Sequence, residues 1–339
     1  MSDIASDLKT LFRAVKIRNA MEYEIGGRIF NLTNPSMQQQ PHVHGWSAFT
    51  PMVAPLVGDM QLRLYDWAYC RRMHGAVDMQ PQWNAAQIMD ALSAANAGRD
   101  RWEQGWRITQ VYPNGSIHAQ KGGRFVMFQP GHFMSGQGMP YPGAMAAVYL
   151  AKESRTMQSG FYYVMSETVP EQQIEARPTR IYFNIDEAGA PLLVRAVSTE
   201  LNRFEIPFRF KTLSYSGMYN RADAAVLFFA KRFFPIIARL LPRLLAPIKD
   251  HLRPATPLFS KKLRDGLGLA EDPGNGESFG SNRIRLVAQA IWDAHLRGLT
   301  SEDARLQELD LQFQQSGLRL DQPHLRGASA DLYEVPSDN

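Results

Sequence analysis

Cysteine is nearly absent from this chain: Cys70 is the one cysteine among 339 residues. A single thiol excludes an internal disulfide framework and fits a protein that works in a reducing compartment. A large excess of charge of one sign is also lacking, because 37 Lys and Arg against 33 Asp and Glu leave a formal net charge of +4. So slight an excess argues against a nucleic-acid-binding protein, although it suits an anionic substrate.

The sequence also lacks an uninterrupted apolar run of the roughly 20 residues that a membrane span requires. Its most apolar segment, 231–254, is interrupted by cations and prolines, among them Lys231, Arg232, Arg239, Arg243, Lys249, Pro235, Pro242 and Pro247. A kinked core helix with its cations at the surface is the favoured interpretation; attachment to anionic lipid and docking of a partner remain alternatives. Residues 1–20 carry acidic side chains before any apolar run, which excludes a secretory signal and predicts a cytoplasmic protein.

What the chain does contain is a stretch between residues 179 and 230 in which apolar and polar residues follow a regular pattern. In 179–185, apolar residues alternate with Arg180 and Tyr182, and in 205–213 they alternate with Arg209 and Lys211. This period of two predicts two half-buried strands, and the apolar stripe of 190–204 predicts a helix packed behind them. We therefore expect a group of functional side chains beside one sheet face, although cations there are often simply solvated. The group consists of Arg180, Tyr182, Lys211 and Arg221.

The remaining segments predict an α+β fold with a mostly antiparallel sheet flanked by helices. Residues 1–20 form a helix, 29–58 a loop, 106–133 a β-meander, and 139–167 two strands that join the sheet of residues 179–230. A Pro/Gly-rich loop spans 253–283, and helices follow at 282–297 and 301–317. The expected regions are a helical and β-meander part, 1–140, suited to binding a peptide or partner, a domain at 141–325 and a frayed tail at 326–339.

Metal and nucleotide sites are weakly supported. His42, His44 and His74 invite a metal interpretation, but no carboxylate or cysteine stands at ligand spacing. The glycines of 266–276 match neither phosphate-binding motif of nucleotide-binding proteins. We therefore expect neither a metal nor another cofactor.

Three segments, 159–168, 179–230 and 266–283, resemble the HopA-type family of type III secretion effectors. Their most specific pieces are RIYFN, PFRFK, YNRADAAVLFF and AEDPGNGESFG. Relatives of that family act in thioamitide and class V-type lanthipeptide biosynthesis. There, the resemblance implies, the protein is the lyase partner of a separate kinase-like phosphotransferase. The kinase phosphorylates Ser or Thr of a precursor peptide, and the lyase eliminates phosphate to leave a dehydroamino acid.

A more distant similarity is to phosphothreonine lyases, which carry a Lys-x-His on one strand, a later Lys and then an Arg. It implies a phosphothreonine-lyase-like core with an N-terminal α/β extension. Arg180-x-Tyr182 stands in the first position here, and Lys211 and Arg221 follow in order. Because the histidine is replaced, the general acid is either Tyr182 or a histidine from elsewhere, for which His118 of the β-meander is the candidate.

The chemistry assigns the remaining roles. Lys211 is the expected base, because cationic neighbours depress the pKa of an amine. Arg180 and Arg221 hold the phosphate, since a guanidinium matches its oxygens in a bidentate way, and Arg283 at a helix start is a third ligand. The substrate-orienting candidates are Tyr219, Asp223, Glu271, Asp272 and Ser278.

Two alternatives remain open. One is a host-directed effector with the same chemistry on a folded phosphoprotein. The other is a non-catalytic partner that binds a kinase or phosphopeptide through the same cations.

Overall fold

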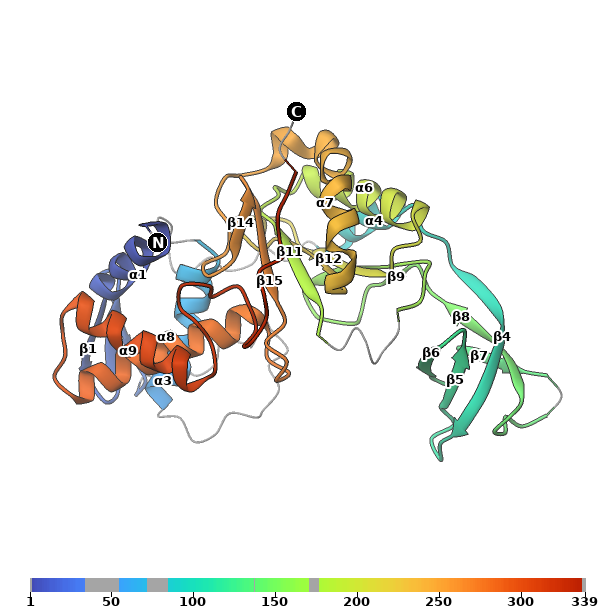
Figure 1. The fold of residues 1–339 in the computed structure, drawn as a ribbon, viewed down its shortest axis with the longest axis horizontal. Helices are drawn as coiled ribbons and strands as arrows, with labels where there is room; N and C mark the ends of the chain where they lie inside the picture. The colour runs from blue at the N-terminus through green and yellow to red at the C-terminus, as the bar shows by residue number, and fades with distance from the viewer. Residues whose placement is uncertain (1, 34–54, 72–84, 137, 171–176, 337–339) are drawn as a thin grey trace.

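A seven-stranded antiparallel sheet forms the centre of the molecule (Figure 1). The computed structural model describes residues 2–33, 55–71, 85–136, 138–170 and 177–336. The strands follow the order β14-β15-β11-β13-β12-β10-β9, and every neighbouring pair is antiparallel. Their bounds are β9 Glu153–Ser154, β10 Phe161–Met165, β11 Thr179–Phe183, β12 Phe208–Leu213, β13 Ala225–Phe229, β14 Lys261–Arg264 and β15 Leu267–Glu271. The α+β prediction is confirmed.

Helices cover both faces of this sheet. On one face, Ile181, Phe210 and Leu227 pack with apolar residues of α6 (Gly189–Arg203) and α7 (Phe234–Leu245). On the other face, Tyr182 and Val226 belong to a core that includes residues of α3, η1 and α8. Short helical turns flank α7. The bounds of these elements are α3 Pro55–Leu64, η1 Tyr65–Tyr69, α8 Phe279–Leu296, η2 Lys231–Phe233 and η3 Ala246–His251.

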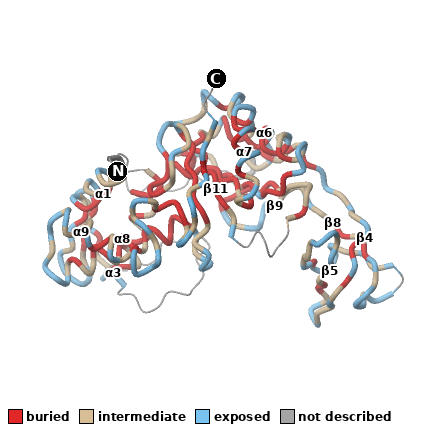
Figure 2. Tube along the Cα trace, viewed as in Figure 1, coloured by how far each residue is buried: buried red, intermediate tan, exposed pale blue. Residues whose placement is uncertain are grey.

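Strand β13 lies between β11 and β12, so the two strands predicted from the alternating segments are not neighbours. Both are antiparallel to β13, and they are therefore parallel to each other, joined through α6. The additional helix α4 (Ala85–Ala95) packs beside α6. Figure 2 shows that buried residues are concentrated in this central layer and in the helices around it.

The first and last helices of the described chain pack together at one side of the molecule (Figure 1). Helix α1 (Ser2–Ala14) packs against α9 (Glu302–Gln315), and Arg305 Nη1 of α9 donates to the carbonyl oxygens of Phe12 (2.6 Å) and Val15 (2.7 Å). A three-stranded sheet follows α1, where sequence analysis expected more helix and then a loop. Its strands are β1 Val15–Asn19, β2 Glu22–Ile25 and β3 Arg28–Asn31. The positive φ angles of Gly26 and Gly27, 57° and 86°, make the turn between β2 and β3.

A separate five-stranded sheet, order β6-β5-β4-β8-β7, lies at the opposite side of the molecule (Figure 1). Its strands are β4 Arg101–Val111, β5 Ile117–Lys121, β6 Arg124–Phe128, β7 Phe133–Ser135 and β8 Met145–Leu150. The β-meander prediction therefore agrees with the structure. Strand β8, however, pairs with β4 and not with the central sheet, which corrects the expected position of the first strand in 139–167.

The segment 253–283, expected to be a loop, contains the β14–β15 hairpin. Asp265 and Gly266 form its turn, and Gly266 has a φ of 72°. A Cβ at Gly266 would stand 2.6 Å from the carbonyl oxygen of Arg253, so only glycine fits there. This hairpin extends the central sheet beyond β11.

The segment after α9 packs against the body, in contrast to the expected frayed tail. Arg283 of α8 is fully buried and donates to the carbonyl oxygens of Pro323 (2.8 Å) and Leu325 (2.7 Å). The Tyr333 hydroxyl donates to Glu271 Oε1 at 2.7 Å. Among the described residues, no helix is both long and apolar enough to cross a membrane.

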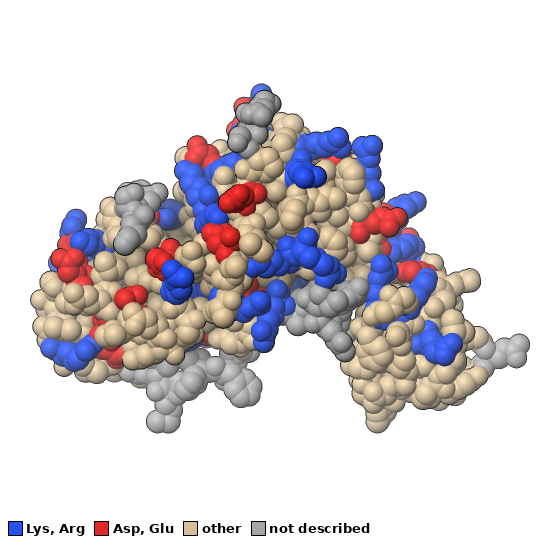
Figure 3. Space-filling model, in the orientation of Figure 1, with Lys and Arg blue, Asp and Glu red and all other residues tan. Residues whose placement is uncertain are grey.

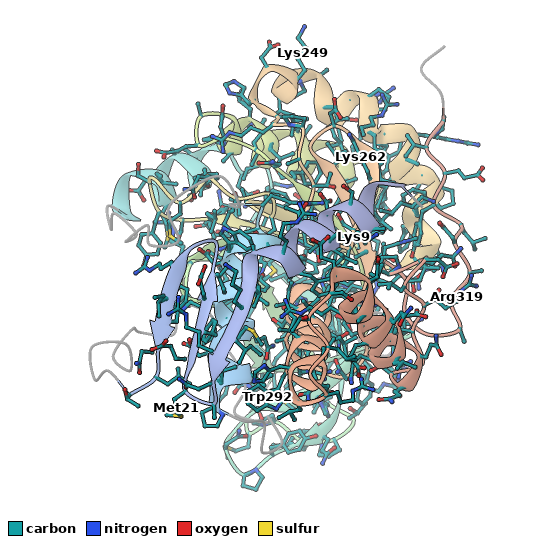
Figure 4. The ribbon with its side chains drawn as sticks, turned by 90° about the vertical axis from the view of Figure 1, so that its left-hand side faces the viewer. Lys9, Met21, Lys249, Lys262, Trp292 and Arg319 are labelled. Carbon is teal, nitrogen blue, oxygen red and sulfur yellow. The ribbon has the colours of Figure 1, made fainter. Side chains whose placement is uncertain are left out.

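We expect Arg283→Ala to lower the free energy of unfolding by about 3 kcal/mol, because it leaves buried carbonyl oxygens without donors. Urea denaturation followed by circular dichroism measures this. Arg319→Ala is the control: its side chain is 68% exposed, pairs with Asp321 and points outward (Figure 4), so the midpoint should stay unchanged. Equal urea midpoints for both variants would contradict a stabilising role of the Arg283 hydrogen bonds.

Candidate functional site

Strand register places the predicted side chains in two rows across one face of the central sheet. The first row runs Tyr163, Lys211, Val226, Tyr182 and Gly268 across β10, β12, β13, β11 and β15. The second row runs Met165, Arg209, Phe228, Arg180 and Ala270 across the same strands. Paired residues in a sheet point to the same face. Lys211, Tyr182 and Arg180 therefore share one face, as their alternation predicts.

Three cations converge on the ring of Phe228. The Cζ atoms of Arg180 and Arg209 lie 5.5 and 5.3 Å from the ring centroid, and Lys211 Nζ lies 5.8 Å from it. An aromatic face attracts cations, which partly offsets their mutual repulsion. The outcome is a compact cationic cluster, Arg180, Arg209 and Lys211, around a single ring.

Lys211 has the most perturbed environment of the cluster. Its Nζ donates to Gln158 Oε1 at 3.0 Å and lies 4.1 Å from the ring centroid of Phe161. Burial lowers the pKa of Lys211 to about 7; Asp223 opposes the shift, and Arg180 together with neighbouring arginines adds to it. A lysine with this pKa is neutral in a large fraction of molecules near neutral pH, as a general base must be.

Arg180 is held by a carboxylate at one end and keeps a donor at the other. Its Nη2 donates to Asp272 Oδ2, while Asp272 Oδ1 accepts from the backbone N–H of Gly274 at 2.8 Å. The Nη1 atom of Arg180 is buried and has no hydrogen-bond partner. A buried donor without a partner costs free energy, so a ligand oxygen would be stabilised there.

Arg221 lies in the loop between β12 and β13 and is almost fully buried. Asp223 holds it in a bidentate pair, with Nε to Oδ1 at 2.5 Å and Nη2 to Oδ2 at 2.8 Å. Burial works against the guanidinium charge, but Asp223 outweighs it and keeps the pKa of Arg221 above its usual range. The positive charge of Arg221 therefore helps to lower the pKa of Lys211. The Nε and Nη2 donors of its guanidinium group are bound to Asp223.

Tyr182 is buried beneath η1 and α8. Its ring lies 6.4 Å from that of Tyr69 and 6.3 Å from that of Phe279. Burial raises the pKa of Tyr182, against the opposing charge of Arg180, so the phenol keeps its proton. Val226 stands between Tyr182 and Lys211 in the row, which puts two strand spacings, about 10 Å, between their backbones.

Sequence reasoning missed Tyr163, which is paired directly with Lys211 across β10 and β12. The Tyr163 hydroxyl donates to Gln158 Oε1 at 2.6 Å, so Gln158 accepts from both the phenol and the Lys211 amine. Burial raises the pKa of Tyr163, and the charges of Arg209 and Arg180 oppose that shift. The period-two pattern of FYYVM was the one available signal, but it does not identify the partner strand.

The structure places His118 outside this site. It lies on β5 of the five-stranded sheet, where its Nδ1 is 2.8 Å from the Tyr112 hydroxyl. The central sheet and the five-stranded sheet lie apart (Figure 1), so the assignment of His118 as the acid is corrected.

Other predicted residues have structural partners instead of open positions. The guanidinium nitrogens of Arg283 donate to the Pro323 and Leu325 carbonyl oxygens and to Asn282 Oδ1, so this residue has a structural role. Burial lowers the pKa of Arg283 to about 10. Tyr219 donates to the Leu213 carbonyl oxygen, and Ser278 caps α8 by accepting from the Ser281 N–H at 3.2 Å. Glu271 accepts from Lys231, Ser329 and Tyr333 and anchors the tail. Asp223 and Asp272 orient the arginines.

Within the described ranges, no group of three or more His, Cys, Asp or Glu side chains could hold a metal ion. His42, His44 and His74, which invited a metal interpretation, lie outside the described residues.

Figure 3 shows Lys and Arg gathered over the middle of the molecule with Asp and Glu nearby, so the positive charge of this surface is partly compensated by carboxylates.

The model of the HopA1 effector protein family matches residues 152–325, just over half of the chain and all seven strands of the central sheet. The chain belongs to the HopA1 effector protein family. No curated protein matches this chain.

The solved structures that are similar to it include two effector proteins. An effector protein from Pseudomonas syringae pv. tomato strain DC3000 is 15% identical with a TM-score of 0.43, over 80% of this chain and 99% of that one. An effector protein from Pseudomonas syringae pv. syringae strain 61 is 15% identical with a TM-score of 0.41, over 82% of this chain and 100% of that one.

We expect Lys211 to titrate at about pH 7, and Asp223→Asn to move that midpoint to lower pH, because it removes the negative charge that favours the protonated amine. The pH dependence of Lys211 acylation by a small reagent, read by peptide mass spectrometry, measures both. A wild-type midpoint near the ordinary value for lysine, about 10, would contradict the cluster's effect on this amine.

Proposed function

We propose that this protein is a phosphoserine/phosphothreonine lyase that eliminates phosphate from a phosphorylated polypeptide. The observation that carries the proposal is Lys211: a half-buried amine with a pKa of about 7 in a cluster with two arginines. Such a cluster brings a base and anion-binding groups to one place. β-Elimination of a phosphate requires both.

The reaction balances with groups of this site. Neutral Lys211 takes the α-proton, and the electron pair of that C–H bond forms the double bond between Cα and Cβ. The Cβ–O bond breaks, and phosphate leaves with its electron pair. The products are a dehydroalanine or dehydrobutyrine residue and inorganic phosphate. The reaction consumes no nucleotide, metal or water.

Arg180 and Arg209 are the phosphate ligands in this proposal. Arg209 is exposed, and Arg180 has the buried Nη1 donor without a partner. A phosphate dianion between them would neutralise charge that the cluster now leaves uncompensated. Arg221 supports the site by its charge on Lys211.

The leaving phosphate oxygen needs a proton, and Tyr163 is the proposed donor. Its phenol is the direct neighbour of Lys211, and both groups donate to Gln158 Oε1. After Tyr163 gives its proton to the leaving oxygen, the phenolate takes up the proton that Lys211 has gained, which restores both groups. Tyr182 lies on the same face but beneath η1 and α8, and it is the second candidate for this role.

The proposed substrate is the one that the resemblance to thioamitide and lanthipeptide lyases implies. A precursor peptide phosphorylated by a separate kinase-like phosphotransferase is the proposed substrate, modified in the cytoplasm. Membership of an effector family favours a second candidate, a phosphoprotein of a host cell into which the lyase is delivered. Both substrates use the same chemistry.

We expect loss of phosphoric acid from a synthetic phosphothreonine peptide, recorded by mass spectrometry without nucleotide or added metal. Lys211→Ala should abolish the product, and Arg209→Ala should lower kcat/KM by about 100-fold, because each removes a group of the reacting centre. Lys262→Ala is the matched control: Lys262 lies on β14, exposed and outside the cluster (Figure 4), and should keep full activity.

Tyrosine variants identify the acid. Tyr163→Phe should lower kcat with little change in KM, whereas Tyr162→Phe should not. Tyr162 is the adjacent buried phenol, and its hydroxyl is bound to Glu153 at 2.7 Å. A full loss in Tyr182→Phe with an active Tyr163→Phe would transfer the role to Tyr182.

Restored hydroxyl in place of the dehydrated residue would mean hydrolysis and would overturn the lyase mechanism. Retained phosphopeptide affinity in every variant, with no product in any, would support a non-catalytic phosphopeptide-binding protein instead.

A further inference from the structure

The outer face of the five-stranded sheet carries exposed apolar side chains from four strands. They are Trp102 (45% exposed), Met127 (40%), Met134 (53%) and Met145 (53%). Register places Trp102 opposite Tyr149, Met127 opposite His118 and Met145 opposite Arg107, and alternation turns the core residues Trp106, Ile108 and Val148 to the other face. We call this surface, defined by Trp102, Met127, Met134 and Met145, the Met face.

Methionine suits a surface that accepts varied apolar partners, because its side chain is unbranched and polarisable. Figure 2 shows few buried residues in the five-stranded sheet, in contrast to the central layer. In the view of Figure 3, the sheet presents mainly uncharged atoms with a few Lys and Arg. Several exposed apolar side chains on one sheet face are typical of an interaction site.

The charge of this sheet defines the partner further. Residues 101–150 contain four cations and a single acid, but register turns Arg101, Lys121, Arg124 and Glu103 to the core side of the sheet, so the Met face carries Arg107 and none of the acid. Glu103 is already paired with Lys121 at 2.6 Å. Arg107 is exposed and stands on the Met face beside Met145. An acidic partner with apolar side chains is therefore complementary to this surface.

The Met face is also connected to the site by a short path. Strand β8 ends at Leu150, and β9, at the edge of the central sheet, begins at Glu153. From β9, the strand order leads through β10 to β12, which carries Lys211. Two strand spacings, about 10 Å, separate that edge from the base. Two residues therefore join the sheet of the Met face to the edge of the sheet that carries Lys211.

We propose that the Met face docks an acidic, extended segment of the substrate polypeptide, whose apolar side chains contact the methionines and Trp102 and whose carboxylates face Arg107. An extended chain presents alternate side chains to one side, which matches this pattern of apolar and basic residues. The docking role rests on the proposed function only in that the segment belongs to the phosphorylated substrate.

Fluorescence anisotropy tests this with the full chain and a labelled peptide of about ten residues in which Glu alternates with Leu. The peptide has no Ser or Thr, so binding is independent of phosphate chemistry. Met127→Glu and Arg107→Glu should each weaken binding by about tenfold. The same peptide with Lys in place of Glu should not bind.

Matched controls lie elsewhere on the surface. Met21→Glu changes a methionine with the same 40% exposure, in the turn before β2, and Lys249→Glu makes the same charge change as Arg107→Glu, on η3. Figure 4 places both residues on the outer surface, one by the strands β1–β3 and the other near α7. Neither control should alter the affinity.

Three results would overturn the proposal. One is equal binding of the Lys peptide, or equal loss in the controls. Another is binding to anionic phospholipid vesicles, but not to the Glu peptide, that Met127→Glu abolishes; this would assign the face to a membrane surface. The third is a dimer in sedimentation that Met127→Glu dissociates. Peptide binding retained in a protein without lyase activity would overturn the proposed function alone.

Discussion

The site depends on one electrostatic constraint: three cations share the space around the Phe228 ring. Like charges in a partly buried region repel one another, and burial adds a desolvation cost. An arginine cannot relieve this by losing its proton, because its intrinsic pKa is too high. Lysine can lose its proton, so the repulsion and the desolvation cost are reduced at Lys211, whose pKa falls to about 7. The reactive amine is thus a consequence of burial first and of its cationic neighbours second.

The neighbours are held in place by the apolar core on the other side of the sheet. Ile181, Phe210 and Leu227 pack with α6 and α7, and a shift of one residue in any strand would turn them to the wrong face. The same shift would remove Arg180 or Lys211 from the site. Asp272 and Asp223 then fix the guanidinium groups of Arg180 and Arg221. Strand register thus fixes where the cationic side chains lie, and the carboxylates fix how the guanidinium groups are oriented.

Sequence reasoning could predict the face but not the neighbours. Alternation correctly put Arg180, Tyr182 and Lys211 on one side, because the period of a strand is a local property. It could not show that β13 enters between β11 and β12, that Tyr163 pairs with Lys211, or that β5 with His118 belongs to another sheet, since pairing joins segments far apart in the chain. The partners of Arg283 are backbone carbonyls, which no residue type reveals. The Asp265–Gly266 turn was available as a hairpin signal and was overlooked.

The family match begins at residue 152 and so includes the cationic cluster but not the five-stranded sheet. This division has a physical consequence for selectivity. In the proposed reaction, the lysine base and the two arginines contact only the phosphate and the Cα–H group, which all phosphoserine and phosphothreonine residues share. Selection among substrates must therefore come from contacts outside the cluster. A docking surface near the sheet edge would raise the effective concentration of one phosphorylated chain at Lys211 without any change in the chemistry. Reaction and recognition can then vary independently, because different strands carry them.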